Sequence, residues 1–189
     1  MLRCMPMKSV HLALLIWSLV VPSQIHARVF LARQEALQAA FPGSDRLEPQ
    51  DLFLTEDQLS RIEAKCGTRP PSALVTVYRG YQQDRLLGCA VFDTHTVRTR
   101  PETFLIVFDP QGAVANLLLC AFYEPPEYAP PDNWLKQFAG KRNMPETVVG
   151  RTVAGITGST LTAHAVSAST RRAMAIYQTC ISDAPPRSE

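Results

Sequence analysis

A hydroxyl-rich segment near the C-terminus has residue types suited to holding a phosphate group. It reads GITGSTLTAHAV from position 155, and its TGST sequence at 157–160 comes directly before a stretch of helical periodicity. The first amides of a helix have no partner within the helix, and that end of the helix dipole is positive. Gly158 lets a bulky group approach the backbone closely. The segment therefore predicts an anion site at the start of the last helix.

The same segment also has simpler interpretations. Serine and threonine are the preferred N-cap residues, so TGST alone is typical of an ordinary helix start. It lacks the spaced glycines and the lysine of a P-loop. A hydrolase that uses these hydroxyls is disfavoured because no general base adjoins them, and His164 lies one turn along the helix.

The surrounding sequence resembles the C-terminal motif of the FMN-binding domain family. That family includes the covalent-flavin subunits of sodium-pumping and Rnf-type redox complexes and part of the nitrous-oxide regulator. In its motif, a segment of the form D-x-x-S/T-G-A-T-x-T/S precedes a helix, and the threonine after the alanine can carry FMN through a phosphoester. The resemblance makes Thr160 the implied attachment residue. The cofactor-binding residues that it implies in this segment are Thr157, Gly158, Ser159, Thr160, Leu161 and Thr162.

A second match lies upstream and adds Glu124 to the implied FMN site. The family often has a glutamate before a Pro/Gly loop, followed by an aromatic helix with a phenylalanine-glycine-lysine ending. Glu124-Pro125-Pro126 and the segment WLKQFAGK at 134–141 are similar to this pattern. The resemblance places Glu124 near the flavin ring or ribityl chain, with contact area from Tyr123 and Trp134. The alternatives are a loop cap for Glu124 and ordinary core or rim positions for the two aromatic residues.

Two positions depart from the family motif. Ala154 stands where the motif has an acid, and Ser159 stands where it has an alanine. If the attaching flavin transferase reads that acid, FMN would be held without a covalent bond, or the domain would have kept the fold and lost its flavin. The resemblance covers roughly Ala73 to Tyr177.

The first 27 residues have the pattern of a secretory signal peptide. Arg3 and Lys8 precede an apolar run from Val10 to Val21, and small residues follow up to Ala27. The run is short for a bilayer span, which takes roughly 20 residues. We therefore expect a periplasmic or secreted protein that begins near position 28. An uncleaved membrane anchor is the alternative.

The charge balance argues against a nucleic-acid partner. The chain has 19 Lys and Arg against 17 Asp and Glu, and the signal peptide contains the two surplus cations, Arg3 and Lys8. No basic stripe with interleaved aromatic residues is left after its removal. The resemblance instead implies redox proteins, including membrane-bound ones, as partners, and a flavin transferase for maturation.

The expected function is that of an extracytoplasmic electron carrier with FMN as cofactor, rather than of a stand-alone enzyme. FMN would be attached by a phosphoester to Thr160, with no catalytic residue and no metal ligand in the chain. The alternative function is a non-redox extracytoplasmic binding or regulatory domain that kept the fold. His95 is expected to lie in a polar turn with Arg98 and Arg100.

Four cysteines follow the signal peptide, and their pairing is open. An even number permits two disulfides with three connectivities in an oxidising compartment, whereas buried free thiols suit the apolar strand-like runs around two of them. There is no CxxC pair, so a thioredoxin-type redox site is not indicated. The four are Cys66, Cys89, Cys120 and Cys180.

The pattern of elements predicts an α+β fold, with an antiparallel sheet and helices at both ends of the domain. A helix is expected over 29–41, and a capping box at Thr55–Gln58 predicts a second one that ends at Gly67. Asp132 is expected to cap a short third helix. Four strands are expected at 73–78, 86–92, 104–108 and 113–122. The predicted divisions are a signal peptide at 1–27, a helical leader at 28–72, the FMN-binding domain at 73–180 and a disordered tail at 181–189.

Overall fold

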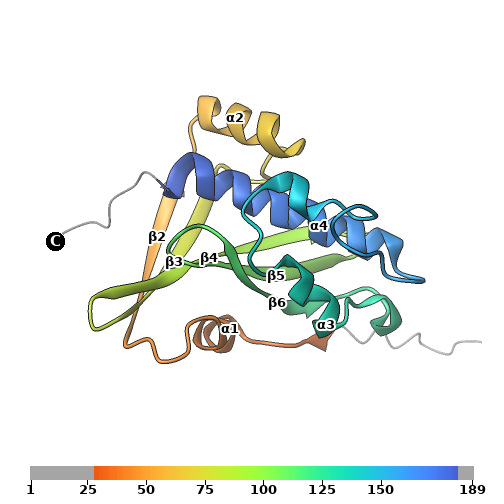
Figure 1. The fold of residues 1–189 in the computed structure, drawn as a ribbon, viewed down its shortest axis with the longest axis horizontal. Helices are drawn as coiled ribbons and strands as arrows, with labels where there is room; N and C mark the ends of the chain where they lie inside the picture. Colours follow the sequence, from red (N-terminus) through yellow and green to blue (C-terminus); the bar gives the residue numbers. More distant parts are fainter. Residues whose placement is uncertain (1–27, 183–189) are drawn as a thin grey trace, which may run out of the picture.

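The computed structural model describes residues 28–182, so the predicted signal peptide and the segment 183–189 lie outside the described residues (Figure 1). Six strands form one antiparallel sheet in the order β1-β6-β5-β4-β3-β2. From β2 to β6, each strand pairs with the next one along the chain, which confirms the predicted α+β fold and its meander. The strands are β1 (Arg28–Val29), β2 (Arg46–Phe53), β3 (Leu74–Gln82), β4 (Arg85–Thr96), β5 (Pro101–Phe108) and β6 (Val114–Phe122).

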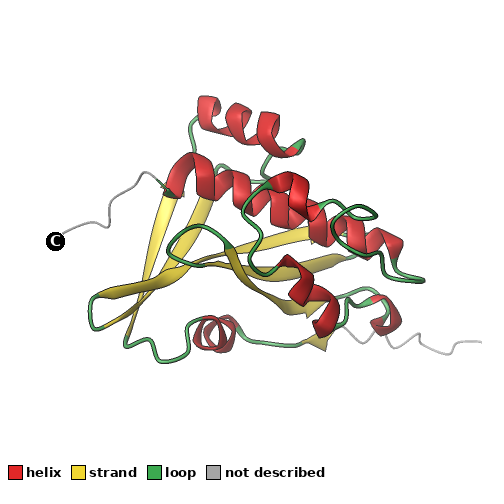
Figure 2. Cartoon of the chain, viewed as in Figure 1, coloured by secondary structure: helices red, strands yellow, loops and turns green. Residues whose placement is uncertain are grey.

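Helices cover both faces of the sheet, with α2 and α4 on one side and α1 on the other (Figure 2). The main core lies under α2 and α4. Phe104, Ile106 and Phe108 of β5 are fully buried there, and they alternate with Leu105 and Val107, which are buried in a second core on the other face. The helices are α1 (Arg33–Ala40), α2 (Glu56–Cys66), α3 (Asp132–Leu135) and α4 (Thr160–Ile176).

The capping box predicted for α2 is confirmed. Thr55 Oγ1 accepts from the amide of Gln58 at 3.3 Å, and the side chain of Gln58 accepts from the amide of Thr55 at 2.9 Å. Gly67 ends the helix in the left-handed conformation, with φ +78°. Leu59 and Ile62 face the core, so both the capping residues and the apolar face stabilise this helix.

Two sequence predictions near the N-terminus need correction. The helix expected over 29–41 begins only at Arg33, because Arg28–Val29 pair with Phe122 and Ala121 as β1. Strand β2 was not expected, since it contains Pro49 and alternates weakly. Proline is tolerated there because β2 is the edge strand of the sheet. The segment 28–72 thus contributes strands to the same sheet as 73–180.

The connections after β6 are short helical turns. They are η1 (Pro126–Tyr128), η2 (Lys136–Phe138), η3 (Met144–Thr147) and, after α4, the π-helical η4 (Tyr177–Ile181). Asp132 does not cap α3 as predicted: Pro131 is the N-cap, and no side-chain cap bond forms. Ile181, which the sequence assigned to the tail, is buried in the main core.

The four cysteines of the described chain are free thiols. Cys89 and Cys120 lie on opposite faces of the sheet, in separate cores, which leaves them unable to pair with each other. Burial raises the pKa of Cys89 to about 12 and that of Cys120 to about 11. Within residues 28–182, no helix has the length and hydropathy needed to span a bilayer.

Candidate functional site

A cavity of about 240 Å³ lies where α4 begins. It brings together residues that are far apart in the sequence, because the β4–β5 loop, the proline loop after β6 and the N-terminus of α4 meet at this end of the sheet. Six of the seven residues predicted for the cofactor line it. The lining residues are Val97, Arg98, Glu124, Tyr128, Gly158, Ser159, Thr160, Leu161 and Thr162. Thr157, the seventh predicted residue, is exposed and lies outside this lining.

The start of α4 is not capped by a side chain. Ser159 holds the N-cap position but makes no side-chain cap bond, and its hydroxyl donates instead to the carbonyl of Glu127 at 3.5 Å. The first bond inside the helix runs from the amide of Ala163 to the carbonyl of Ser159 at 3.1 Å. The interpretation of TGST as an ordinary serine cap therefore does not describe this helix start.

Three backbone amides are left as donors at the cavity. In the described chain, the amides of Thr160, Leu161 and Thr162 have no hydrogen-bond acceptor. They belong to residues that line the cavity, at the positive end of a helix of 17 residues. The arrangement offers an anion several donors with the favourable end of the dipole.

Gly158 shapes the approach to these amides. Its φ of +80° lies in the left-handed region that glycine adopts without cost, and a Cβ there would meet nothing within 4 Å. The turn closes with a bond from the amide of Ser159 to the carbonyl of Ile156 at 3.0 Å. Thr160 follows, and it is an exposed residue that lines the cavity.

Glu124 closes the other side of the cavity by holding the β4–β5 loop. Its Oε1 accepts from the amides of Thr99 at 2.7 Å, Arg100 at 2.9 Å and Arg98 at 3.2 Å. Burial opposes ionisation of this carboxyl, but the three amides outweigh it and lower its pKa. The loop-cap alternative for Glu124 is thus confirmed, and the same side chain borders the cavity.

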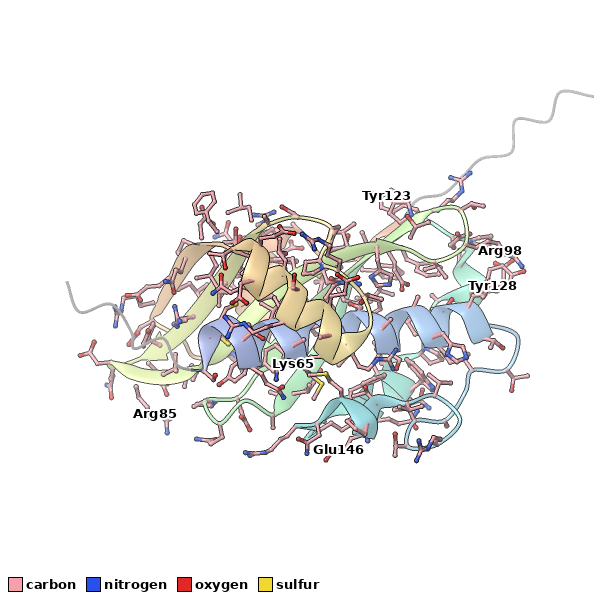
Figure 3. All side chains as sticks on the ribbon, turned by 90° about the horizontal axis from the view of Figure 1, so that it is seen from above. Lys65, Arg85, Arg98, Tyr123, Tyr128 and Glu146 are labelled. Carbon is pink, nitrogen blue, oxygen red and sulfur yellow. The ribbon has the colours of Figure 1, made fainter. Side chains whose placement is uncertain are left out.

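Three cavity residues were missed from the sequence, and Val97 of the β4–β5 loop is one of them. Arg98 and Tyr128 come from the β4–β5 loop and from η1, and both lie at the end of the molecule where α4 begins (Figure 3). Arg85 lies at the opposite end of the molecule. No spacing in the sequence marks any of the three residues, because each reaches the cavity only through the path of a loop.

The two aromatic residues suggested as ring contacts lie elsewhere. Trp134 is buried in the main core, and its Nε1 donates to the carbonyl of Ala154 at 2.7 Å. The amide of Ala154 donates to Gln137 Oε1 at 2.9 Å. Neither Trp134 nor Tyr123 lines the cavity, so Trp134 is a core residue that fixes the loop before the motif.

A buried polar network between β4, β5 and α4 was also missed. His95 was expected in a polar turn, but it lies in β4, with Nδ1 2.9 Å from Asp93 Oδ2 and Nε2 2.6 Å from Glu102 Oε1. Arg172 of α4 donates twice to Asp93, and Ser169 donates to it at 2.7 Å. The network joins α4 to the middle of the sheet.

The charges of this network depend on each other. Burial disfavours the charged form of His95, but the bonds to Asp93 and Glu102 outweigh it and raise its pKa to about 9. Asp93 is buried as well, yet its bonds to His95, Arg172 and Ser169 lower its pKa to about 2. Burial raises the pKa of Glu102, whose Oε2 is buried without a partner among residues 28–182.

No group of three His, Cys, Asp or Glu side chains in the described residues could hold a metal ion. The chain matches no model of a known protein family and no curated protein sequence. The geometry of the cavity and the resemblance of its residues to the FMN motif are therefore what bears on function.

Proposed function

We propose that this chain binds FMN at the start of α4 and carries electrons outside the cytoplasm. The strongest support for the proposal is the position of three groups around one cavity. The exposed residue Thr160, the unpartnered amides of the first helical turn and Glu124 border a single cavity. These are the residues that the resemblance to the FMN-binding domain family assigns to the cofactor.

The residues at this cavity fit the phosphate end of FMN. The amides at 160–162 supply donors, Arg98 adds a cation to the lining, and Gly158 keeps the approach free of a side chain. The cavity of about 240 Å³ is smaller than the roughly 300–1,000 Å³ of sites that enclose a drug-sized ligand. The three-ring system would therefore lie partly at the surface, near Leu161, a residue that is 52% exposed.

Bound FMN would supply one- and two-electron redox chemistry, and the chain would supply position and polarity. A covalent tether suits a cofactor outside the cytoplasm, because association otherwise costs an estimated ~4–15 kcal/mol in lost freedom of motion. A helix N-terminus contributes only about 0.3–1 kcal/mol toward an anion in most settings. The dipole alone would therefore not retain the flavin.

Attachment would use Thr160 as an acceptor during maturation. Its Oγ1 would bond to the phosphorus of an activated flavin phosphate, as the bond from phosphorus to the donor's leaving group breaks and the hydroxyl proton is released. No histidine or carboxylate among the described residues hydrogen-bonds to Thr160. The base would thus come from the flavin transferase that we propose as a maturation partner.

The proposed location is the periplasm or the cell exterior, on the strength of the predicted signal peptide at 1–27. Retention of that segment as a membrane anchor is the alternative. In either case, the electron donors and acceptors would be other redox proteins, membrane-bound ones among them. The partly exposed ring expected from the small cavity suits direct transfer to such partners.

Intact-mass measurement tests the proposal. Wild type produced with a flavin transferase is expected to gain the mass of FMN less one water, and Thr160→Ala is expected to lose that gain. Thr157→Ala is the matched control, since Thr157 is an exposed neighbour outside the cavity lining. If the wild type lacks the increment but turns yellow on incubation with FMN, the flavin binds without a covalent bond. A colourless, unmodified wild type would overturn FMN binding.

One observation favours the second candidate, a non-redox binding or regulatory domain with the same fold. Ala154 occupies the position of the motif's acid, and its backbone is held by Trp134 and Gln137, away from the cavity lining. If the transferase requires that acid, Ala154→Asp is expected to increase flavin incorporation. If neither the wild type nor Ala154→Asp incorporates flavin, the non-redox function is favoured.

A further inference from the structure

Strands β3 and β4 separate before either of them ends. Their pairing runs from Gln82 and Arg85 at the hairpin to Val77 and Val91, whereas β3 begins at Leu74 and β4 continues to Thr96. The residues 74–76 and 92–96 therefore have no partner across this pair of strands, and the strands diverge here (Figure 1). We call this opening the strand gap.

A cavity of about 270 Å³ occupies the strand gap. Its lining comes from both faces of the sheet, with Arg33 of α1 on one side and Arg172 of α4 on the other. Apolar side chains supply much of the wall, among them Pro71, Phe92 and Ile176. The cavity is thus apolar in its body and charged at its two ends.

Arg172 lines this cavity and has donors that no described residue uses. Its Nε donates to Asp93 Oδ1 at 2.8 Å and its Nη2 donates to Asp93 Oδ2 at 2.6 Å, so one edge of the guanidinium is taken. A guanidinium has five N–H donors, and the edge formed by Nη1 and Nη2 keeps three of them. Nη1 has no acceptor among the described residues, and this atom is not fully enclosed by them.

The orientation of that free edge is fixed by the buried network. Asp93 is held by Ser169 and by His95 in addition to Arg172, and the side chain of Arg172 is 9% exposed. A guanidinium that cannot rotate loses little freedom when it binds a second planar anion, and its fork geometry suits a carboxylate. The site is therefore built before any ligand arrives.

The charges of the lining select a monoanion. The lining contains two arginines, Arg33 and Arg172, and one carboxylate, Asp93, so its formal charge is +1. Arg33 already donates to Tyr78 at 2.9 Å and lies 5.3 Å from the ring centre of Phe92, so it is positioned at its end of the cavity. A small acid with an apolar body would meet the free edge of Arg172 and cover the apolar wall.

We propose that the strand gap binds a small monocarboxylate with an apolar tail. The site is separate from the cavity at the start of α4, because Arg172 lies twelve residues along the helix from Thr160, about 18 Å away. It does not depend on FMN. Such a ligand would bridge α4 and the separated strands, where the sheet lacks its own hydrogen bonds.

Hexanoate is a suitable probe, with 1-hexanol as the uncharged control of the same body. In amide-resolved NMR of the isotope-labelled protein, millimolar hexanoate is expected to shift signals of residues 72–76 and 92–94, and hexanol is expected to shift them far less. Arg172→Lys keeps the charge but loses the fork, and is expected to weaken hexanoate binding about tenfold. Arg33→Gln, at an exposed position, is expected to weaken it about threefold.

Arg85→Gln is the matched control, since Arg85 is an exposed arginine at the hairpin end of the same strands. It is expected to bind hexanoate like the wild type. The proposal is overturned if hexanoate shifts no signals at the strand gap, or if hexanol shifts them equally. It is also overturned if Arg33→Gln binds like the wild type, a test that stands even where Arg172→Lys does not fold.

Discussion

Glu124 Oε1 accepts a hydrogen bond from the backbone amide of Thr99 at 2.7 Å, although the two residues are 25 positions apart in the chain. The same oxygen accepts the amides of Arg98 and Arg100, so one carboxylate fixes the whole turn of the β4–β5 loop. Because Arg98 lines the cavity at the start of α4, the shape of that cavity depends on Glu124.

Glu124→Ala is expected to destabilise the protein by roughly 1–3 kcal/mol, because it leaves the amides of this turn without their acceptor. Glu124→Gln keeps a neutral oxygen at the same place and is expected to lose less. Urea unfolding of both variants measures the difference, with Glu127→Ala as an exposed control in the same loop. If Glu124→Ala also retains full flavin incorporation, the loop does not shape the FMN site.

Replacement of Arg172 by Met is expected to cost roughly 3–5 kcal/mol, since it leaves the buried carboxylate of Asp93 without its cation. The double variant Asp93→Leu with Arg172→Met removes both charges and is expected to recover much of the loss. The exposed pair Arg61 and Asp57 provides the control, where Arg61→Ala is expected to cost under about 1 kcal/mol. Equal losses of stability at the two sites would show that the buried ion pair contributes no more to stability than the exposed one.

The parts of the fold that local chemistry determines could be predicted from the sequence. The capping box and Gly67 fix both ends of α2, and the start of α4 at Thr160 follows from the change in periodicity after 160. Strand β2 could not be predicted, because Pro49 and exposed polar residues suit only an edge strand. Its place at the edge is decided by pairing with β3.

The candidate site could be predicted only where its residues are contiguous. Five of its lining residues form the segment 158–162, whereas Arg98 and Tyr128 arrive on loops whose paths depend on tertiary contacts. The network around His95 could not be predicted for the same reason. It needs Arg172, which is 79 positions away from Asp93, and no local pattern relates a strand histidine to an arginine on a distant helix.

The network around His95 is expected to make stability decline in alkaline solution. The pKa of His95 is about 9 in the folded chain, above the ordinary value of 6.5, so its contribution is complete below pH 6.5 and is lost as pH rises through 9. Glu102, whose pKa is also raised, acts in the same direction. Asp93 acts oppositely, because its pKa of about 2 gives a contribution that is lost only as pH falls through 2.

Thermal unfolding between pH 5 and pH 10 measures this effect. The loss attributable to His95 is expected to be roughly 3 kcal/mol across that range. His95→Gln is expected to be less stable at pH 6 and to show a flatter profile above it. His164→Gln is the control, because His164 is exposed on α4 and lies outside the network. A profile for His95→Gln parallel to that of the wild type would contradict the assignment.

Gly158→Ala tests whether the left-handed backbone before α4 is needed to present the helix amides. An alanine at φ +80° costs about 1 kcal/mol, and relief of that strain is expected to rotate the amide of Ser159 and lower flavin incorporation. Gly155→Ala is the matched control, since a Cβ at either glycine meets nothing within 4 Å but only Gly158 has a positive φ. Gly158→Asn, which tolerates this region better, is expected to lie between them. A Cβ is accommodated at both glycines, so steric crowding does not distinguish the two alanine variants. If both variants lower the melting temperature equally, the left-handed backbone at 158 is not needed for the site.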